Sequence, residues 1–219
     1  MRGVFLSKVK IMEPTYISAF KGIGNNAMYI ANDGNIYEHS GGTIAWRNNN
    51  PGNMRAYSSV FERGAIGIGG AATNNAPGFA IFPDVNTGWN AMVGLLSSDT
   101  YQKLTIEEAI IRYAPPQENN VEAYLKSVEK QTGFPRITPM NNLSKDNLLA
   151  LAKAMRIHES SKSGKIRIVP KNEKYVWVTS GDDKVRPEHE ALDGTVRSWY
   201  DSPRPGEEYG CRCHAESAD

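Results

Sequence analysis

Apolar side chains recur at helical spacing in four stretches, and this pattern predicts four helices. Their expected limits are 87–98, Thr105 to the residue before Pro115, the residue after Asn120 to Gly133, and Ser144 onward. Thr105 and Glu108 have the spacing of a capping box, which marks the start of the second helix. Gly133 is suited to a left-handed C-terminal cap, which ends the third.

The fourth helix ends its apolar stripe on an acid. Leu148, Leu151, Ala152 and Met155 form the stripe, and Glu159 occupies its next position. Burial disfavours a charged carboxylate, so an acid at this place suits proton transfer. The alternative is that the helix has already ended and that Glu159 turns into solvent.

Shorter apolar runs predict strands on both sides of these helices. Residues 28–37 are typical of a hairpin turning at Asn-Asp-Gly-Asn, and 78–83 and 175–179 of extended segments. Residues 64–78 are rich in Gly, Ala and Asn and predict a loop lying close to other backbone. We therefore expect a flexible lead over 1–27, a larger domain over 28–161, and a linker with a small module over 162–219.

The composition is that of an ordinary globular chain. With 219 residues and a net charge of +1, it gives no electrostatic argument for a nucleic-acid partner. No apolar run reaches the roughly 18–20 residues that span a bilayer. Lys8 and Lys10 interrupt the apolar start too early for a secretory signal. We expect a protein made in the cytoplasm, without membrane insertion, that another carrier brings to its place of action.

A polar stretch between the hairpin and the Gly-rich loop holds the densest candidate chemistry. It runs Trp46-Arg47-Asn48-Asn49-Asn50-Pro51-Gly52-Asn53-Met54-Arg55. Pro, Gly and Asn exclude a helix interior or a central strand there. Amides beside an aromatic ring suit sugar binding, whereas the simpler interpretation is a polar surface turn.

Residues 41–55 resemble phage-associated and secreted bacterial proteins that share a Trp-Arg-Asn-Asn-Asn-Pro-Gly-Asn signature. The resemblance continues through 64–67, 79–83 and 112–120 to Tyr124, so it covers about 40–160. It implies peptidoglycan cleavage by a mainly α, lysozyme-like α+β domain. In related glucosaminidases and transglycosylases a Glu-Ser helix comes first, whereas here Glu159-Ser160 comes last. We therefore expect a circularly rearranged domain with Glu159 beside the asparagine stretch.

Glycan cleavage needs one carboxylic acid to protonate the glycosidic oxygen. Glu159 is the first candidate. Glu118 is the second candidate, and its alternative role is to cap the next helix. Glu38 is the third candidate, and its alternative is an exposed charge at the end of a strand. The expected sugar-binding residues are Trp46, Arg47, Asn48, Asn49, Asn50, Asn53, Tyr113, Asn119 and Tyr124. Trp46 and Tyr113 would serve equally as core aromatics.

The C-terminal module resembles the tail of phage Mu F-like head-morphogenesis proteins. The matching residues are 175–179, 181–189, 192–194 and 205–213. Such tails often carry a Cys-x-x-Cys where this chain has Arg186 to His189. His189, Cys211, Cys213 and His214 are ligand types that zinc accepts, although the cysteines would serve equally as buried apolar groups. Asp182, His189 and Cys211 would alternatively form an amidase or peptidase site.

The expected function is therefore a muramidase or lytic transglycosylase with peptidoglycan as its partner. It would act in the periplasm or wall of a target cell, as an antibacterial toxin or a phage lysin. A secretion machine or a virion would carry it, and the class implies an immunity protein. The competing hypothesis is a virion structural protein that binds the wall without cutting it.

Overall fold

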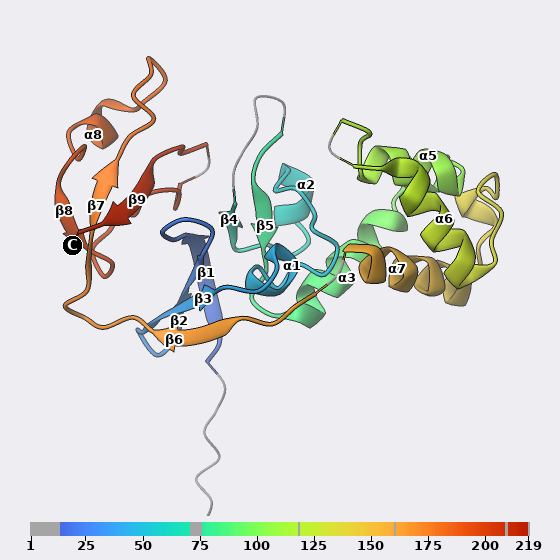
Figure 1. Ribbon diagram of the computed structural model, residues 1–219, viewed down its shortest axis with the longest axis horizontal. Coiled ribbons are helices and arrows are strands. Elements are labelled where there is room, and N and C mark those ends of the chain that lie inside the picture. The colour runs from blue at the N-terminus through green and yellow to red at the C-terminus, as the bar shows by residue number, and fades with distance from the viewer. Residues whose placement is uncertain (1–13, 71–75, 118, 160, 209, 219) are drawn as a thin grey trace, which may run out of the picture.

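The computed structural model describes residues 14–70, 76–117, 119–159, 161–208 and 210–218. Within them lie eight α-helices and two sheets, with about 34% helix and 21% strand. The expected mainly α, lysozyme-like fold is therefore wrong, and the chain has a mixed α/β fold. Figure 1 shows the six-stranded sheet in the middle, helices α5 to α7 at one end, and the three-stranded sheet with α8 at the other.

The larger sheet has the strand order β5-β4-β1-β2-β3-β6. Its strands are β1 (Tyr16–Lys21), β2 (Ala27–Ala31), β3 (Ile36–Ser40), β4 (Gly67–Gly69), β5 (Phe79–Ile81) and β6 (Lys165–Ile168). The predicted hairpin is confirmed, because β2 and β3 pair antiparallel. Strand β4 pairs parallel with β1 and antiparallel with β5, so two parts of the chain meet in one sheet.

Strand β1 lies inside the stretch for which the sequence predicts a flexible lead. It has β2 on one side and β4 on the other. The approach of β4 requires glycine, because a Cβ on Gly67 would lie 1.9 Å from the carbonyl oxygen of Ala19. The Gly-rich stretch thus does lie close to other backbone, as expected.

All four predicted helices are present, with small differences at their ends. They are α3 (Val85–Leu96), α5 (Ile106–Tyr113), α6 (Val121–Thr132) and α7 (Lys145–Glu159). The capping box of Thr105 and Glu108 is formed, and Gly133 ends α6 with a φ of +73°. The short helices α1 (Ile44–Arg47), α2 (Ser58–Phe61) and α4 (Asp99–Gln102) and the 3-10 helix η1 (Met140–Asn142) complete this part.

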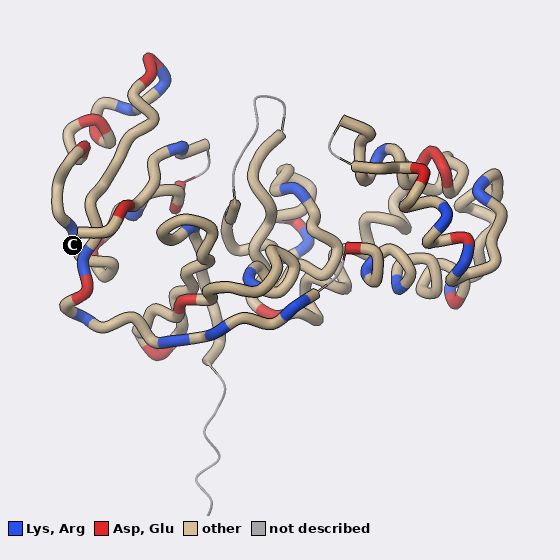
Figure 2. Tube along the Cα trace, in the orientation of Figure 1, with Lys and Arg blue, Asp and Glu red and all other residues tan. Residues whose placement is uncertain are grey.

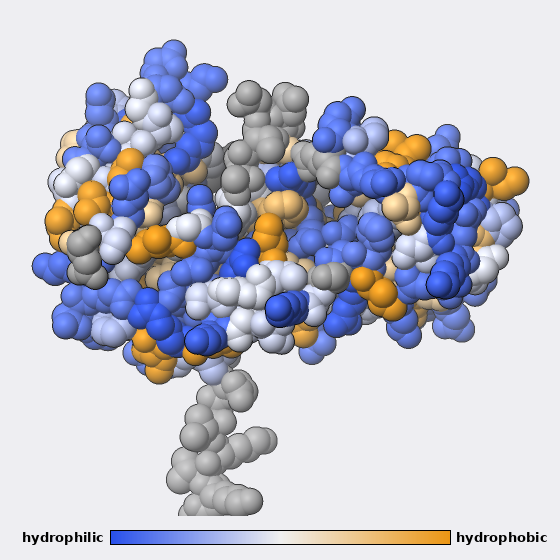
Figure 3. Space-filling model, viewed as in Figure 1, coloured by the Kyte–Doolittle hydropathy of each residue, from blue (hydrophilic) through white to orange (hydrophobic). Residues whose placement is uncertain are grey.

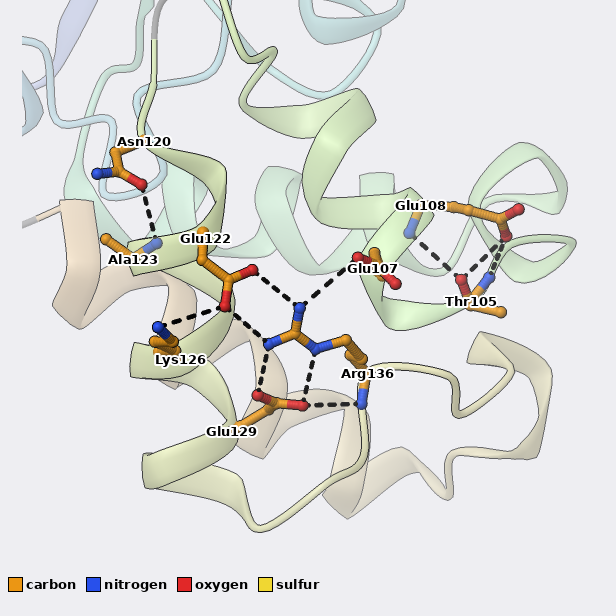
Figure 4. A network of polar contacts seen from close by, with 9 residues as sticks. All are labelled: Thr105, Glu107, Glu108, Asn120, Glu122, Ala123, Lys126, Glu129 and Arg136. Atoms are coloured by element: carbon orange, nitrogen blue, oxygen red, sulfur yellow. Dashed lines mark hydrogen bonds and ion pairs between the residues drawn. The ribbon is translucent and has the colours of Figure 1, made fainter.

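Arg136, in the loop after α6, connects helices α5 and α6. Arg136 lies 3.0 Å from both Glu122 and Glu129 of α6 and 3.7 Å from Glu107 of α5 (Figure 4). Hydrogen bonds from Arg136 lower the pKa of both Glu122 and Glu129. The loop after α6 is thereby attached to α5 as well as to α6.

The C-terminal part packs on the larger sheet. It contains β7 (Lys174–Val178), α8 (Pro187–Glu190), β8 (Val196–Ser198) and β9 (His214–Ser217), with β7 central in the small sheet. Phe20 of β1 stacks on Trp199 with ring centroids 6.0 Å apart, and both are buried in the core that Tyr175 and Trp177 share. Strand β6 pairs with β3, so the segment after α7 also joins the larger sheet.

The described surface carries no single dominant charge. Basic and acidic residues are interspersed over every part of the fold (Figure 2), and the face in Figure 3 is mostly hydrophilic with small, separate apolar patches. None of the helices described here is long and apolar enough to cross a membrane.

A buried histidine makes the fold sensitive to acid. His39 on β3 is 3% exposed, and burial lowers its pKa from 6.5 to about 4. Between these two pKa values the unfolded chain binds more protons than the folded chain. The stability that depends on neutral His39 is therefore fully present above pH 6.5 and is lost as the pH drops toward 4. We expect a loss of about 3 kcal/mol over this window. Urea unfolding at pH 7 and pH 4.5 measures it.

The variant His39→Gln should lose most of this pH dependence. The matched control is His158→Gln, because His158 is exposed at the end of α7. An unchanged difference between the two pH values in His39→Gln would contradict the assignment.

Candidate functional site

The asparagine stretch is a tight loop that its own amides hold in shape. Asn49 and Asn53 have φ values of +50° and +49°, a left-handed region that Asn tolerates. Asn50 is fully buried; its amide donates to the carbonyls of Met54 and Ala80, and its oxygen accepts from the Met54 N–H. Asn50 therefore builds the loop.

The residues before Asn50 are also used inside the fold. Arg47 is buried and donates to the carbonyls of Gly41 and Gly42. Burial lowers the pKa of its guanidinium. Asn48 is 2% exposed, and the Asn49 amide donates to the carbonyls of Phe82 and Pro83. Trp46 stacks on His39 at 5.2 Å. These expected sugar-binding residues thus make contacts within the fold, and their part in sugar binding stays a prediction.

Asn53 is the member of the stretch that meets the acid. Helix α7 extends through Glu159, and the Asn53 amide donates to Oε2 of Glu159 at 3.0 Å. Glu159 is half-buried, since its position continues the buried stripe of Leu151 and Met155. The expectation that Glu159 lies beside the asparagine stretch is confirmed, although the fold class that motivated it was wrong. Figure 1 shows α7 ending near the loop after α1.

Two tyrosines surround the same carboxylate. The Tyr113 hydroxyl donates to the Gly52 carbonyl at 2.6 Å, and Tyr124 is fully buried with its hydroxyl 3.5 Å from the Met155 carbonyl. Burial, followed by the negative charge of Glu159, raises the pKa of both phenols. A hydrogen bond to Glu159 raises the pKa of Tyr124 further. Both phenols are therefore protonated at neutral pH and act as donors.

A cavity of about 260 Å³ opens in front of this group. Asn53, Tyr113, Asn119 and Glu159 line it. Of the described residues around the cavity, Glu159 supplies the carboxylate. The site therefore offers one acid beside amide, phenol and guanidinium groups.

Arg55, Arg112 and Phe79 also line the cavity but were missed as site residues. Arg55 lies over the Phe79 ring at 4.1 Å. All three belong to segments for which the sequence predicts a resemblance to peptidoglycan-cleaving proteins: Arg55 ends the asparagine stretch, Phe79 begins the aromatic strand, and Arg112 precedes Tyr113. Their positions in these segments were the signal that would have identified them.

The two other candidate acids do not contribute to the described lining of this cavity. Glu118 lies outside the described residues. Glu38 is 7% exposed, forms an ion pair with Arg167 and accepts the Asn26 amide at 2.8 Å. Glu38 is therefore buried, in contrast to the exposed strand-end charge that was expected as the alternative. Both of its oxygens have structural partners.

The C-terminal part brings together three of the four expected metal ligands. Nδ1 of His189 lies 3.6 Å from Sγ of Cys211 and 3.7 Å from Sγ of Cys213. Both cysteines precede β9 and their thiols lie at His189, whereas His214, the first residue of β9, lies outside this group. His214 instead lies 3.4 Å from Glu216. Burial, followed by the neighbouring Cys211, raises the pKa of Cys213 to about 12.

The same geometry bears on the alternative amidase site. Asp182 pairs with Arg212 at 2.5 Å, and the second ring nitrogen of His189 faces Glu208 at 3.6 Å. Asp182 thus does not orient His189, as an acid in a Cys-His-Asp triad would.

Residues 116–216 match the protein family described as Phage Mu protein F like protein. The matched segment begins before α6 and extends through α7 and β6 to the small sheet. The predicted phage Mu F-like resemblance of the tail is therefore confirmed, and the C-terminal part of the chain is phage-related. A comparison with curated proteins gives no match for the chain.

Proposed function

We propose that this protein cleaves the glycan strand of peptidoglycan, with Glu159 as the acid. The observation that supports this most is the hydrogen bond from Asn53 to Glu159 at the edge of a cavity. That bond occupies Oε2, so Oε1 is the oxygen that would carry the proton to the glycosidic oxygen. The resemblance of 40–160 to phage and toxin proteins with the asparagine signature supports the same substrate.

The surroundings of Glu159 favour a mechanism with one acid. A second carboxylate is absent among the described residues that line this cavity. A lytic transglycosylase needs only one acid, because the sugar closes an anhydro ring on itself, whereas a muramidase directs water to the same carbon. Asn119 and Tyr113 would hold the sugar, whereas Tyr124 and Asn53 orient the carboxylate.

Muropeptide analysis of digested sacculi tests the proposal. Anhydro products indicate a lytic transglycosylase, reducing muramic acid ends a muramidase, and reducing glucosamine ends a glucosaminidase. Sacculi without new products would contradict glycan cleavage.

In the cell, we propose that the protein acts on the wall of a target cell as an antibacterial toxin or a phage lysin. A secretion machine or a virion would carry it there. As a toxin, it would be blocked by an immunity protein.

The second candidate is a virion assembly protein that binds the wall without cutting it. The match of 116–216 to the Phage Mu protein F-like family favours it. The same digest separates the two hypotheses, because a binding protein sediments with sacculi and releases no muropeptides.

We also propose that His189, Cys211 and Cys213 hold a zinc ion in the C-terminal part. Tetrahedral bonds of about 2.3 Å to sulfur and about 2.0 Å to nitrogen separate the two atoms by about 3.5 Å. The observed separations of 3.6 and 3.7 Å fit this geometry. Glu208 faces the other ring nitrogen, as carboxylates behind metal-binding histidines commonly do. The metal would fasten a turn-rich segment that has little core of its own.

Metal analysis of the purified protein is expected to give about one zinc per chain in wild type and a large loss in Cys213→Ser, because the thiolate is a main ligand. A chelator should lower the melting temperature of wild type but not of Cys213→Ser. The matched control is His214→Ala, which should retain the metal because His214 points away. Equal metal content in wild type and Cys213→Ser would contradict the site.

A further inference from the structure

The cavity at Glu159 continues into a second and larger one. This second cavity has a volume of about 500 Å³ and shares Arg55, Tyr57, Arg112 and Tyr113 with the first. The two therefore form one groove, with Glu159 in one arm and Arg63 in the other.

The second arm is lined by cations and hydroxyl groups together with apolar side chains such as Met54 and Leu95. Arg55, Arg63 and Arg112 line it together with the hydroxyl-bearing Ser98 and Thr100. The described lining residues of this arm include no carboxylate. Because the whole chain has a net charge of only +1, three arginines in one cavity do not follow from a generally basic composition.

Two of these guanidinium groups have no anionic partner among the described residues. Arg63 is half-buried and donates to the Ser59 carbonyl at 2.7 Å, a hydrogen bond that holds it over the arm. Arg112 is exposed, with its guanidinium 6.0 Å from the centre of the Tyr101 ring. Arginine binds carboxylates in a fixed, bidentate geometry, so these groups suit a ligand that brings its own carboxylates.

We propose that this arm binds the carboxylates of a peptide attached to the glycan, through Arg63 and Arg112. This inference rests on the proposed glycan cleavage and defines its substrate further. A bare strand offers these guanidinium groups only hydroxyl and acetamido oxygens and the single lactyl carboxylate of each muramic acid. The stem peptide of peptidoglycan hangs from that same sugar and carries further carboxylates. The groove thus selects peptide-bearing strands over bare ones.

The test compares two substrates and three variants. The substrates are glycan strands with their stem peptides and the same strands after enzymatic removal of the peptides. Wild type should cleave the peptide-bearing strands with the higher kcat/KM. In Arg112→Gln and in Arg63→Gln/Arg112→Gln this preference should fall, by about tenfold for each charge-assisted hydrogen bond removed and mainly through KM. The preference is the ratio of the two kcat/KM values, so each variant is compared with its own rate on bare strands.

The matched control is Arg156→Gln, which removes a positive charge from α7 near Glu159 but outside both arms. It should keep the wild-type preference. Equal cleavage of both substrates by wild type, or an unchanged preference in the double variant, would overturn the inference while leaving glycan cleavage intact. Cleavage of neither substrate by wild type would overturn the proposed function itself. A melting curve for each variant confirms folding. If the double variant does not fold, Arg112→Gln, a single change at an exposed residue, tests the inference by itself.

Discussion

Replacing Glu159 by glutamine is expected to lower the rate of muropeptide release from sacculi by roughly 10²–10⁴-fold. The amide has nearly the same shape, and its oxygen can still accept the hydrogen bond from Asn53. It cannot deliver a proton to a glycosidic oxygen, so the loss should appear in kcat and not in KM. Initial rates on purified sacculi, followed by product chromatography, measure it.

The control for this prediction is Glu62→Gln, which removes an exposed carboxylate at the end of α2 and outside the groove. Its rate should equal that of wild type, and both variants should melt close to the wild-type temperature. Full activity of Glu159→Gln would remove Glu159 from the mechanism and direct attention to Glu118.

Local sequence patterns predict only part of the contact between Asn53 and Glu159. The apolar stripe of α7 predicts its buried face, and the spacing of that stripe predicts that Glu159 continues it. The partners are 106 positions apart, and the residues between them carry no signal of the contact itself. Only the order of segments in a family resemblance predicts the contact, although the fold class that the same resemblance implies is wrong.

The mixed sheet was not predictable because its pairings join distant segments. Strand β1 meets β4 through a single pair of residues, Ala19 and Gly67, and β6 joins β3 after more than a hundred intervening residues. Strand β6 alternates polar and apolar residues as Lys-Ile-Arg-Ile, but it is only four residues long and exposed on all four, so it has no buried face. The helices and the hairpin, in contrast, depend on caps, turns and spacing within a few residues of each other.

The roles of the asparagines could not be assigned from the sequence for a related reason. Identical amides stand at positions 48, 49, 50 and 53, and composition alone makes each a candidate for sugar binding. Their contacts separate them: Asn49 and Asn50 donate to backbone carbonyls, Asn48 is buried, and Asn53 faces the cavity. The stretch is therefore mainly a rigid support that holds one amide against one acid.

The largest expected effect on stability follows from this support. Replacing Asn50 by alanine removes the partners of the Met54 N–H and the Ala80 carbonyl in a fully buried setting. Each buried polar group left without a partner costs about 1–3 kcal/mol, so the free energy of unfolding should fall by about 2–5 kcal/mol. Urea unfolding at neutral pH measures the change.

The control is Asn147→Ala, an exposed position within α7, where alanine favours the helix and stability should stay the same or rise slightly. Because Asn50 also fixes the loop that carries Asn53, the variant Asn50→Ala should lose glycan cleavage even at temperatures where it remains folded. A stable and fully active Asn50→Ala would show that the loop keeps its shape without this residue. The site would then depend on the packing of Gly52 against Tyr113 and Met92, where an added Cβ would lie only 2.1 Å from the tyrosine hydroxyl.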